Sequence, residues 1–329
     1  MSASGSDPTI AWLLKGDPTI RWQALRDLTD ASPGIVSREK RKVAEEGWGA
    51  RLLQRQDREG TWGGGLYTPK WISTTYTMLL LRDLGLPPRH RRAEAACRLL
   101  LDHGLRSDGG IDYSGGRLRT RADTPQPGQP RRGRGETCVT GIVLSILATF
   151  EFDDPRLDTL VEHLLDEQMP DGGWNCDRRR GATHASMNTT ILALEGLNAY
   201  RRFRRRRARA VEVAERAGRE FLLVHRLFRS HRTGEVIKPS FVRASFPPRW
   251  HYDFLRALDY FQAVRAPRDR RLEEAITLVR QSRRPDGRWT LQNSFAQGRV
   301  FFHMEANRQP SRWNTLRALR VLRWWESEN

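Results

Sequence analysis

Two short clusters combine the side chains that proton transfer and anion binding require. His251 and Asp253 are candidate catalytic residues, because imidazole and carboxylate groups serve as general acids and bases. Arg249 and Arg312 suit a phosphate-type anion, which a guanidinium binds through two parallel hydrogen bonds. Aromatic ring faces, which attract cations, are supplied by Trp250, Tyr252 and Trp313. The clusters read RWHYD, residues 249–253, and PSRWN, residues 310–314.

Each cluster lies at the start of an apolar segment with helical periodicity. The apolar segments are 19–29, 72–84, 137–150, 184–199, 250–264 and 311–325. Amphipathic, Arg-rich segments alternate with them near 37–55, 88–103, 155–168, 208–226 and 268–283, and residues 8–15 supply a possible sixth. No segment shows the period-two alternation of a strand, so we expect an all-α fold.

A turn motif recurs between the two kinds of segment. The copies are QDREGTW (56–62), QMPDGGW (168–174) and RRPDGRW (283–289), with weaker versions at Gly109 and Gly234. The interval of about 50 to 60 residues is typical of a helical-hairpin repeat. Glycine permits the tight bend, and we expect each Trp to pack between two helices. We therefore interpret the motif as structural, although the repeat does not explain Cys176 and Asp177.

These repeats resemble those of squalene–hopene and oxidosqualene cyclases and of the β subunits of protein prenyltransferases. The resemblance extends from about Gln54 to Trp325. It implies an α/α toroid (an α6–α6 barrel), which residues 1–329 would form as a single domain, with 8–15 as a closing outer helix. It also implies a central apolar cavity that holds an isoprenoid chain. The basic Pro/Gly-rich segment 113–135 is expected to form a loop over one mouth of the ring.

In such a toroid the inner helices begin on one rim, where their N-termini favour an anion. We expect the rim to bind substrate, because convergent polar groups in an apolar pocket usually mark a binding site. The expected substrate-binding residues are Tyr76, Asn188, Arg249, Trp250, Tyr252, Arg312, Trp313 and Asn314. The alternative is that polar residues here only cap helices. Capping accounts for Ser73, Thr137, Ser186 and Ser311 better than for the two aromatic clusters.

The resemblance specifies the reaction less well than the fold. Class II cyclases protonate an alkene with an Asp-x-Asp-Asp acid. The nearest match here is EFDD, 151–154, and Asp154 precedes Pro155 as a helix cap would. Squalene-type cyclisation is therefore not expected.

Protein prenyltransferases bind zinc through an Asp and a Cys two residues apart and a His. The resemblance assigns these positions to Glu136, Cys138 and His184, with His251 as a possible substitute for His184. Zinc accepts carboxylate, thiolate and imidazole ligands together. The alternatives are that Cys138 is simply a small buried residue and that His184 caps a helix. A prenyltransferase would also need an α-helical partner subunit, which this chain does not contain.

Composition limits the class of protein. The chain carries a net charge of +18, and its basic residues are nearly all Arg. This charge suits a diphosphate or peripheral contact with an anionic membrane surface, or reflects solvated helix faces, and no nucleic-acid-binding motif accompanies it. No run of about 18 apolar residues predicts a membrane span. The N-terminus lacks a secretory pattern and the three cysteines are scattered, so we expect a reducing cytoplasm and no disulfide framework.

Three classes of function remain open. We favour an enzyme that acts on an isoprenoid or prenyl diphosphate. A carbohydrate-active α6–α6 barrel would need two opposed carboxylates about 5–9 Å apart. Its candidate carboxylates are Glu136, Asp253 and Glu305. A non-catalytic lipid-binding or interaction toroid is the third class.

Overall fold

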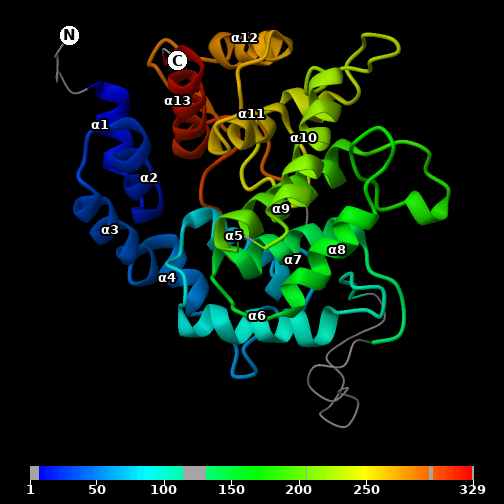
Figure 1. Cartoon of the computed structure of the whole chain (residues 1–329). Helices are drawn as coiled ribbons and strands as arrows, with labels where there is room; N and C mark the ends of the chain where they lie inside the picture. The colour runs from blue at the N-terminus through cyan, green and yellow to red at the C-terminus, as the bar shows by residue number, and fades with distance from the viewer. Residues whose placement is uncertain (1–6, 114–130, 205, 296–298, 328–329) are drawn as a thin grey trace.

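A computed structural model describes residues 7–113, 131–204, 206–295 and 299–327. Within them the chain is mostly helical (Figure 1). The α-helices are α1 (Pro8–Leu14), α2 (Pro18–Leu28), α3 (Pro33–Arg41), α4 (Gly47–Leu53), α5 (Thr74–Leu84), α6 (Arg91–Gly104), α7 (Thr137–Thr149), α8 (Arg156–Asp166), α9 (Met187–Phe203), α10 (Ala208–Val224), α11 (Phe254–Ala263), α12 (Glu273–Gln281) and α13 (Arg312–Glu326). Short 3-10 turns lie at Lys42–Ala44, Arg178–Arg180, Pro239–Val242 and Arg270–Leu272. Residues 114–130 of the expected basic loop lie outside the described residues.

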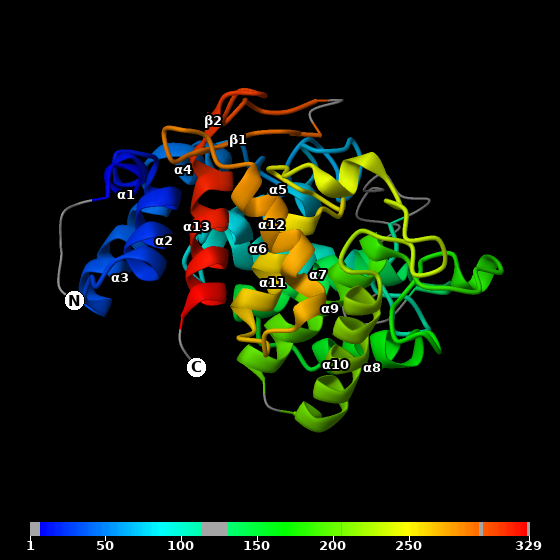
Figure 2. The ribbon, with the colours of Figure 1, turned by 90° about the horizontal axis from the view of Figure 1, so that it is seen from above.

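Six helices match the predicted apolar segments and contact one another in sequence: α2, α5, α7, α9, α11 and α13. Packing joins α5 to α7, α7 to α9 and α11 to α13, and α13 returns to α2 (Figure 2). Trp22 on α2 donates to the carbonyl of Leu84 at the end of α5 over 2.9 Å. The α7 and α9 backbones approach closely because Gly141 and Gly196 face each other; a Cβ at Gly196 would lie 2.6 Å from the Gly141 oxygen.

The amphipathic segments form the remaining helices, with one correction. The predicted helix 37–55 is instead α3, a 3-10 turn and α4. The chain turns at Gly47, which has φ +65. A glycine is required there because the Asp17 carboxylate occupies the place where a Cβ would project. That carboxylate accepts a hydrogen bond of 2.8 Å from Trp48 N at the start of α4. Near the N-terminus, α1 places Trp12 under the guanidinium of Arg288, 4.3 Å away.

The expectation of no strands is wrong at one place. Strands β1 (Trp289–Thr290) and β2 (Pro310–Ser311) form a short antiparallel pair. Two residues are too few to show an alternating pattern in the sequence. The pair ties the third Trp turn to the start of α13.

The three Trp turns have the same geometry. The indole N–H of Trp62, Trp174 and Trp289 donates over 2.7 Å to the carbonyl ten residues earlier, at Leu52, Leu164 and Val279. Each Trp backbone N–H donates to a threonine hydroxyl on the next inner helix, at Thr74, Thr190 and Thr315. The turn glycines all have positive φ, at Gly60, Gly172 and Gly287. These contacts join an outer helix to the next inner helix, as the structural interpretation of the motif requires.

Two inner helices begin later than predicted. Helix α9 begins at Met187 and α11 at Phe254, so His184 and residues 250–252 lie in loops. The reason at α11 is a cap: Asp253 Oδ1 accepts a hydrogen bond of 2.8 Å from Arg256 N. Among the described helices, none is both long and apolar enough to span a membrane.

Candidate functional site

A small pocket with a cavity volume of about 40 Å³ lies near the start of α5. Its walls come from α4 (Leu52), α5 (Thr77 and Leu80), the segments before α5 and α11 (Trp71, Phe246, Pro247 and Arg249) and the segment before α13 (Ser294, Val300, Phe301, Phe302, His303, Met304 and Glu305). Aromatic and aliphatic side chains dominate the walls. Two charged side chains, Arg249 and Glu305, interrupt this apolar lining.

Arg249 is buried in the pocket wall, with 7% of its surface exposed. Its guanidinium carbon lies 4.9 Å from the centre of the Trp71 ring, and Nη1 is 3.5 Å from the Trp71 carbonyl oxygen. Burial lowers the pKa of Arg249 to about 10, so the side chain remains a cation at neutral pH. The predicted anion-binding residue therefore does lie in a pocket.

Aromatic side chains extend from the Trp71 wall. Tyr76 packs edge-on against Trp71, with ring centres 4.8 Å apart, and burial raises the pKa of its hydroxyl. His251 is stacked between Trp250 and Phe295, at 3.8 and 3.7 Å. Burial, and then the nearby Arg256 and other cations, lower the pKa of His251 to about 4. His251 is therefore a neutral imidazole at physiological pH.

Glu305 lies where the pocket meets the start of α13. Its carboxylate accepts hydrogen bonds from the Ser311 hydroxyl and from Arg312 N, the latter at 2.7 Å. Burial raises the pKa of Glu305, although these hydrogen bonds oppose the rise. A raised pKa makes Glu305 a weaker acid than an exposed glutamic acid, so it is poorly suited to protonating an alkene.

The segment that carries Glu305 is attached to α4 by aromatic contacts. The guanidinium carbon of Arg51 lies 3.9 Å from the centre of the Phe302 ring, and that of Arg55 lies 5.8 Å from Phe301. These cation–π contacts hold two pocket-lining rings in place.

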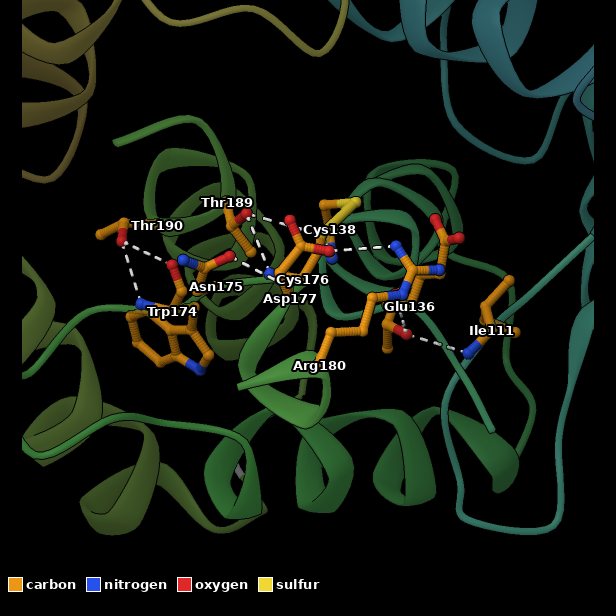
Figure 3. The surroundings of a disulfide bond; sticks show 11 residues. Ile111, Glu136, Cys138, Trp174, Asn175, Cys176, Asp177, Arg180, Thr189 and Thr190 are labelled. Atoms are coloured by element: carbon orange, nitrogen blue, oxygen red, sulfur yellow. Dashed lines mark hydrogen bonds and ion pairs between the residues drawn. A yellow bond between two sulfur atoms is a disulfide. The ribbon is translucent and has the colours of Figure 1, made fainter. Parts of the chain in front are cut away.

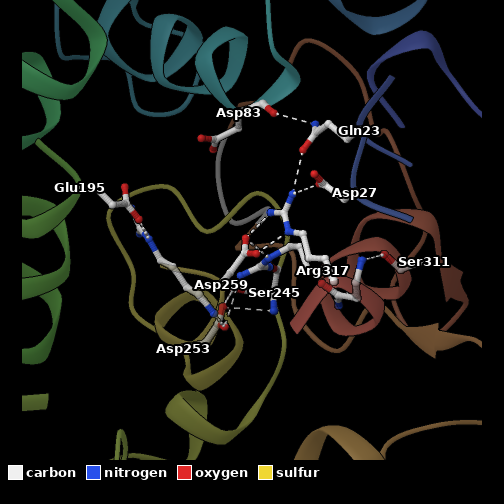
Figure 4. A network of polar contacts seen from close by, with 12 residues as sticks. Gln23, Asp27, Asp83, Glu195, Ser245, Asp253, Asp259, Ser311 and Arg317 are labelled. Atoms are coloured by element: carbon white, nitrogen blue, oxygen red, sulfur yellow. Dashed lines mark hydrogen bonds and ion pairs between the residues drawn. The ribbon is translucent and has the colours of Figure 1, made fainter. Parts of the chain in front are cut away.

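Charged side chains also cross the space between the inner helices (Figure 4). Glu195 on α9 binds Arg256 on α11 through two contacts of 2.7 and 2.9 Å, and Arg82 on α5 at 3.0 Å. On α13, Arg320 pairs with Asp259, and its Nη1 donates to Gln23 on α2 over 3.0 Å. The expectation of a purely apolar central space is therefore wrong: this ion-pair belt occupies part of it.

The structure gives several predicted rim residues other contacts. Asp253 is fully buried, and both carboxylate oxygens accept hydrogen bonds from Ser245 or Arg256 N. Tyr252 is also buried and donates to the Leu227 carbonyl over 2.6 Å, while Asn188 accepts from Tyr252 N. These contacts connect loops and helices, and none of the three residues lines the pocket.

The second cluster is also engaged in packing. The guanidinium of Arg312 lies over the Trp12 ring at 4.3 Å, on the α1 side of α13. Trp313 stacks on Phe246 with ring centres 4.0 Å apart. Asn314 is buried and donates to the carbonyls of Ala244 and Thr290, at 3.1 and 2.9 Å. This cluster therefore reaches the pocket wall through Phe246 and through the hydrogen bonds to Glu305, and none of its own side chains lines the pocket.

Cys138 and Cys176 form a disulfide, although the cysteine pattern predicted a reducing compartment and no disulfide framework (Figure 3). The turn after Trp174 places Cys176 against the first turn of α7, with Cα atoms 5.9 Å apart and Cys138 N donating to Cys176 Sγ over 3.2 Å. The number and spacing of the cysteines did not predict this disulfide. The two cysteines are far apart in the sequence, and the turn after Trp174 brings them together.

The disulfide bears directly on the predicted zinc ligands. Glu136 is half-buried at the start of α7, where burial and Asp112 raise its pKa. His184 is exposed, with Nδ1 2.8 Å from the Thr183 hydroxyl. Cys138, bonded to Cys176, offers no thiolate. The described part of the chain contains no group of three or more His, Cys, Asp or Glu side chains that could hold a metal. The residues as placed do not fit the ion, and we derive no chemistry from it.

Sequence patterns did not predict several residues that line the pocket, including Leu52, Phe246, Phe301 and Phe302. The apolar run VFFHM, residues 300–304, was the available signal, because a polar connection between helices rarely contains one.

Comparisons with known proteins give distant structural similarity only. No family model matches the chain, and no curated protein does. A protein from Actinoplanes is 17% identical, with a TM-score of 0.45, over 95% of this chain and 91% of that one. The type II terpene cyclase MstE from Scytonema, in complex with its substrate geranylgeranyl dihydroxybenzoate, is 13% identical, with a TM-score of 0.35, over 87% of this chain and 94% of that one. The apo form of MstE is 14% identical, with the same TM-score of 0.35, over 87% and 97%. Similarity this distant does not identify a shared function.

Proposed function

We propose that this chain is an α/α toroid that binds an isoprenoid-like apolar small molecule in the pocket beside Arg249. The observation that carries the proposal is the lining of the pocket. Its walls include the rings of Trp71, Phe246, Phe301 and Phe302. A mostly apolar, aromatic lining with a few polar groups is typical of small-molecule sites. Flat aromatic walls suit an unsaturated branched chain, which gains both apolar burial and ring contact.

The toroid rests on how the inner helices follow one another. Their contacts run from α2 through α13 and return to α2, and three identical Trp turns link outer to inner helices. In this arrangement the segments before α5, α11 and α13 meet at one end of the ring. Those are the segments that supply most of the pocket wall.

The proposal is one of binding. Protonating an alkene takes an unusually strong acid, whereas the carboxyl in the described pocket lining, Glu305, has a raised pKa. The two carboxylates that a glycosidase needs are also unsupported, because Asp253 is fully buried away from the pocket. A toroid that binds a ligand fits the lining better than an alkene-protonating cyclase or a glycosidase does. The lining is also compatible with a reaction that does not start with protonation of an alkene.

The test is a titration of the purified protein with farnesol and with a glycan of similar mass, followed by intrinsic tryptophan fluorescence. We expect saturable binding of farnesol only. Leu80→Trp, which fills the pocket, should weaken binding at least tenfold, whereas Leu278→Trp on α12 should leave it unchanged. Circular dichroism checks that both variants fold. The proposal fails if farnesol does not saturate, or if folded Leu80→Trp binds it as tightly as the wild type.

A further inference from the structure

We propose that the ligand of this pocket carries one anionic group, a carboxylate, which Arg249 binds, and that it is not a diphosphate. This inference rests on the proposed function, because it concerns the same pocket. It adds the charge and the orientation of the ligand: a carboxylate end at Arg249 and an apolar chain along the aromatic walls.

The first step of the argument is a comparison among buried arginines. Arg106, Arg249, Arg256 and Arg317 each expose at most 7% of their surface. Three have carboxylate partners: Asp112 for Arg106, Glu195 for Arg256, and Asp259 for Arg317. For Arg249, no ion pair with a carboxylate of the described segments is present, and its Nε makes no hydrogen bond. A buried guanidinium without a carboxylate partner is costly, and its contacts with the Trp71 carbonyl and ring do not neutralise the charge, so Arg249 is the exception that needs an explanation.

The second step is that Arg249 is held in place. Its backbone has φ +56, a left-handed conformation that a non-glycine residue adopts at a cost in free energy. Arg256 Nη1 donates to the Arg249 carbonyl over 3.0 Å and to the His251 carbonyl over 2.7 Å. Arg256 is itself fixed by Glu195. A cation that is placed before the ligand arrives loses little freedom on binding, which favours affinity.

The third step is the charge of the pocket. Arg249 brings one positive charge to the wall, and Glu305 is a carboxylate in the same wall. The Lys70 ammonium lies 5.9 Å from the Trp71 ring centre but is not part of the described lining. One guanidinium matches one carboxylate through two parallel hydrogen bonds. A diphosphate brings more negative charge than Arg249 balances, and an ionised Glu305 repels it more strongly than it repels a carboxylate. The lining therefore favours a singly charged acid over both a neutral alcohol and a diphosphate.

The experiment compares farnesoic acid, farnesol and farnesyl diphosphate at pH 7.5 by isothermal titration calorimetry. In the wild type, the acid should bind at least tenfold more tightly than the alcohol and no less tightly than the diphosphate. Arg249→Gln should weaken binding of the acid more than binding of farnesol and so remove the preference for the acid, and Arg249→Lys should keep part of the preference. Arg243→Gln, which removes an exposed arginine from the same segment, is the matched control and should behave as the wild type.

The outcomes separate the two proposals. Equal binding of acid and alcohol by the wild type refutes the proposal that the ligand carries a carboxylate. The proposed apolar binding site would be unaffected by that result. Diphosphate binding tenfold tighter than the acid refutes the single charge. If none of the three ligands binds, the proposed function itself fails and takes this inference with it. The wild-type comparison needs no variant, so the test stands even if Arg249→Gln does not fold.

Discussion

Arg256 Nη1 donates a hydrogen bond of 3.0 Å to the carbonyl oxygen of Arg249, while the rest of its guanidinium is bound by Glu195. The pocket arginine is thus positioned by an ion pair that lies between α9 and α11. Because the same glutamate also binds Arg82 on α5, one carboxylate connects three inner helices to the pocket wall.

Glu195→Gln should destabilise the protein strongly, because it removes the carboxylate partner of buried Arg256 and leaves Arg82 with Asp83 alone. We expect a loss of about 3–5 kcal/mol in the free energy of unfolding. Urea denaturation measures it, with exposed Glu326→Gln as the control. A change below about 1 kcal/mol would contradict a structural role for the belt.

Stability should fall at acid pH, in a window set by Glu195. Burial raises the pKa of this carboxyl, but Arg256 and Arg82 outweigh burial and lower it to about 2. A carboxyl whose pKa is lower in the folded state contributes stability above its unfolded pKa, here 4.5, and loses it as pH falls toward 2. Urea midpoints between pH 7 and pH 3 should therefore drop mainly below about pH 4.5, and less so in Glu195→Gln.

His251 should remain neutral well below the pH at which an exposed histidine is protonated. Its pKa of about 4 means that only the neutral imidazole stacks between Trp250 and Phe295 at pH 6. An NMR titration of the ring protons, assigned with His251→Gln, checks this. A midpoint near 6.5 for His251 would show that its ring is solvated rather than enclosed.

The three turn tryptophans should be equivalent in energy. Trp62→Phe, Trp174→Phe and Trp289→Phe each remove one buried hydrogen bond of 2.7 Å and leave its carbonyl acceptor without that donor. Each should cost about 1–3 kcal/mol, with the three values close together. Chemical denaturation measures them. Widely different losses in the free energy of unfolding would mean that the shared geometry does not give the three turns the same energetic contribution.

The Cys138–Cys176 bond should stabilise the fold and compete with the predicted zinc site. Reduction, or the double change to Ser, should cost about 2–4 kcal/mol in the chain-entropy account, whereas Cys97→Ser tests a thiol outside the bond. Elemental analysis of reduced wild type and Cys138→Ala tests zinc. Near-stoichiometric zinc that the variant loses would support Cys138 as a ligand of the predicted site, and none in either protein would end that prediction.

Periodic features were predictable from the sequence, and single contacts between helices far apart in the sequence were not. The helix order and the Trp turns follow from apolar spacing and a repeated motif, which are local. The Glu195–Arg256 pair is not local, since its partners are 61 residues apart. A signal existed: charged residues interrupt several of the apolar segments, among them Arg82, Glu195, Arg256 and Arg317. Charges at core positions are seldom buried unless paired, which could have predicted a belt but not its partners.

The candidate site was likewise only partly predictable from the sequence. Arg249 was predicted from its residue type and lies in the pocket. Asp253 and Asn314, chosen for the same reason, are a helix cap and a buried link between two carbonyls. Sequence alone could not separate these roles, because both need a polar side chain at a helix start.

The return of α13 to α2 has a consequence for biosynthesis. The Arg320 contact with Gln23 joins residues 297 positions apart, so the part of α2 that packs on α13 stays uncovered until α13 has been synthesised. Contacts this distant in sequence also slow folding, since a long loop must close before they form. Until α13 arrives, this exposed part of α2 is available for contacts with other chains, which favours aggregation over folding.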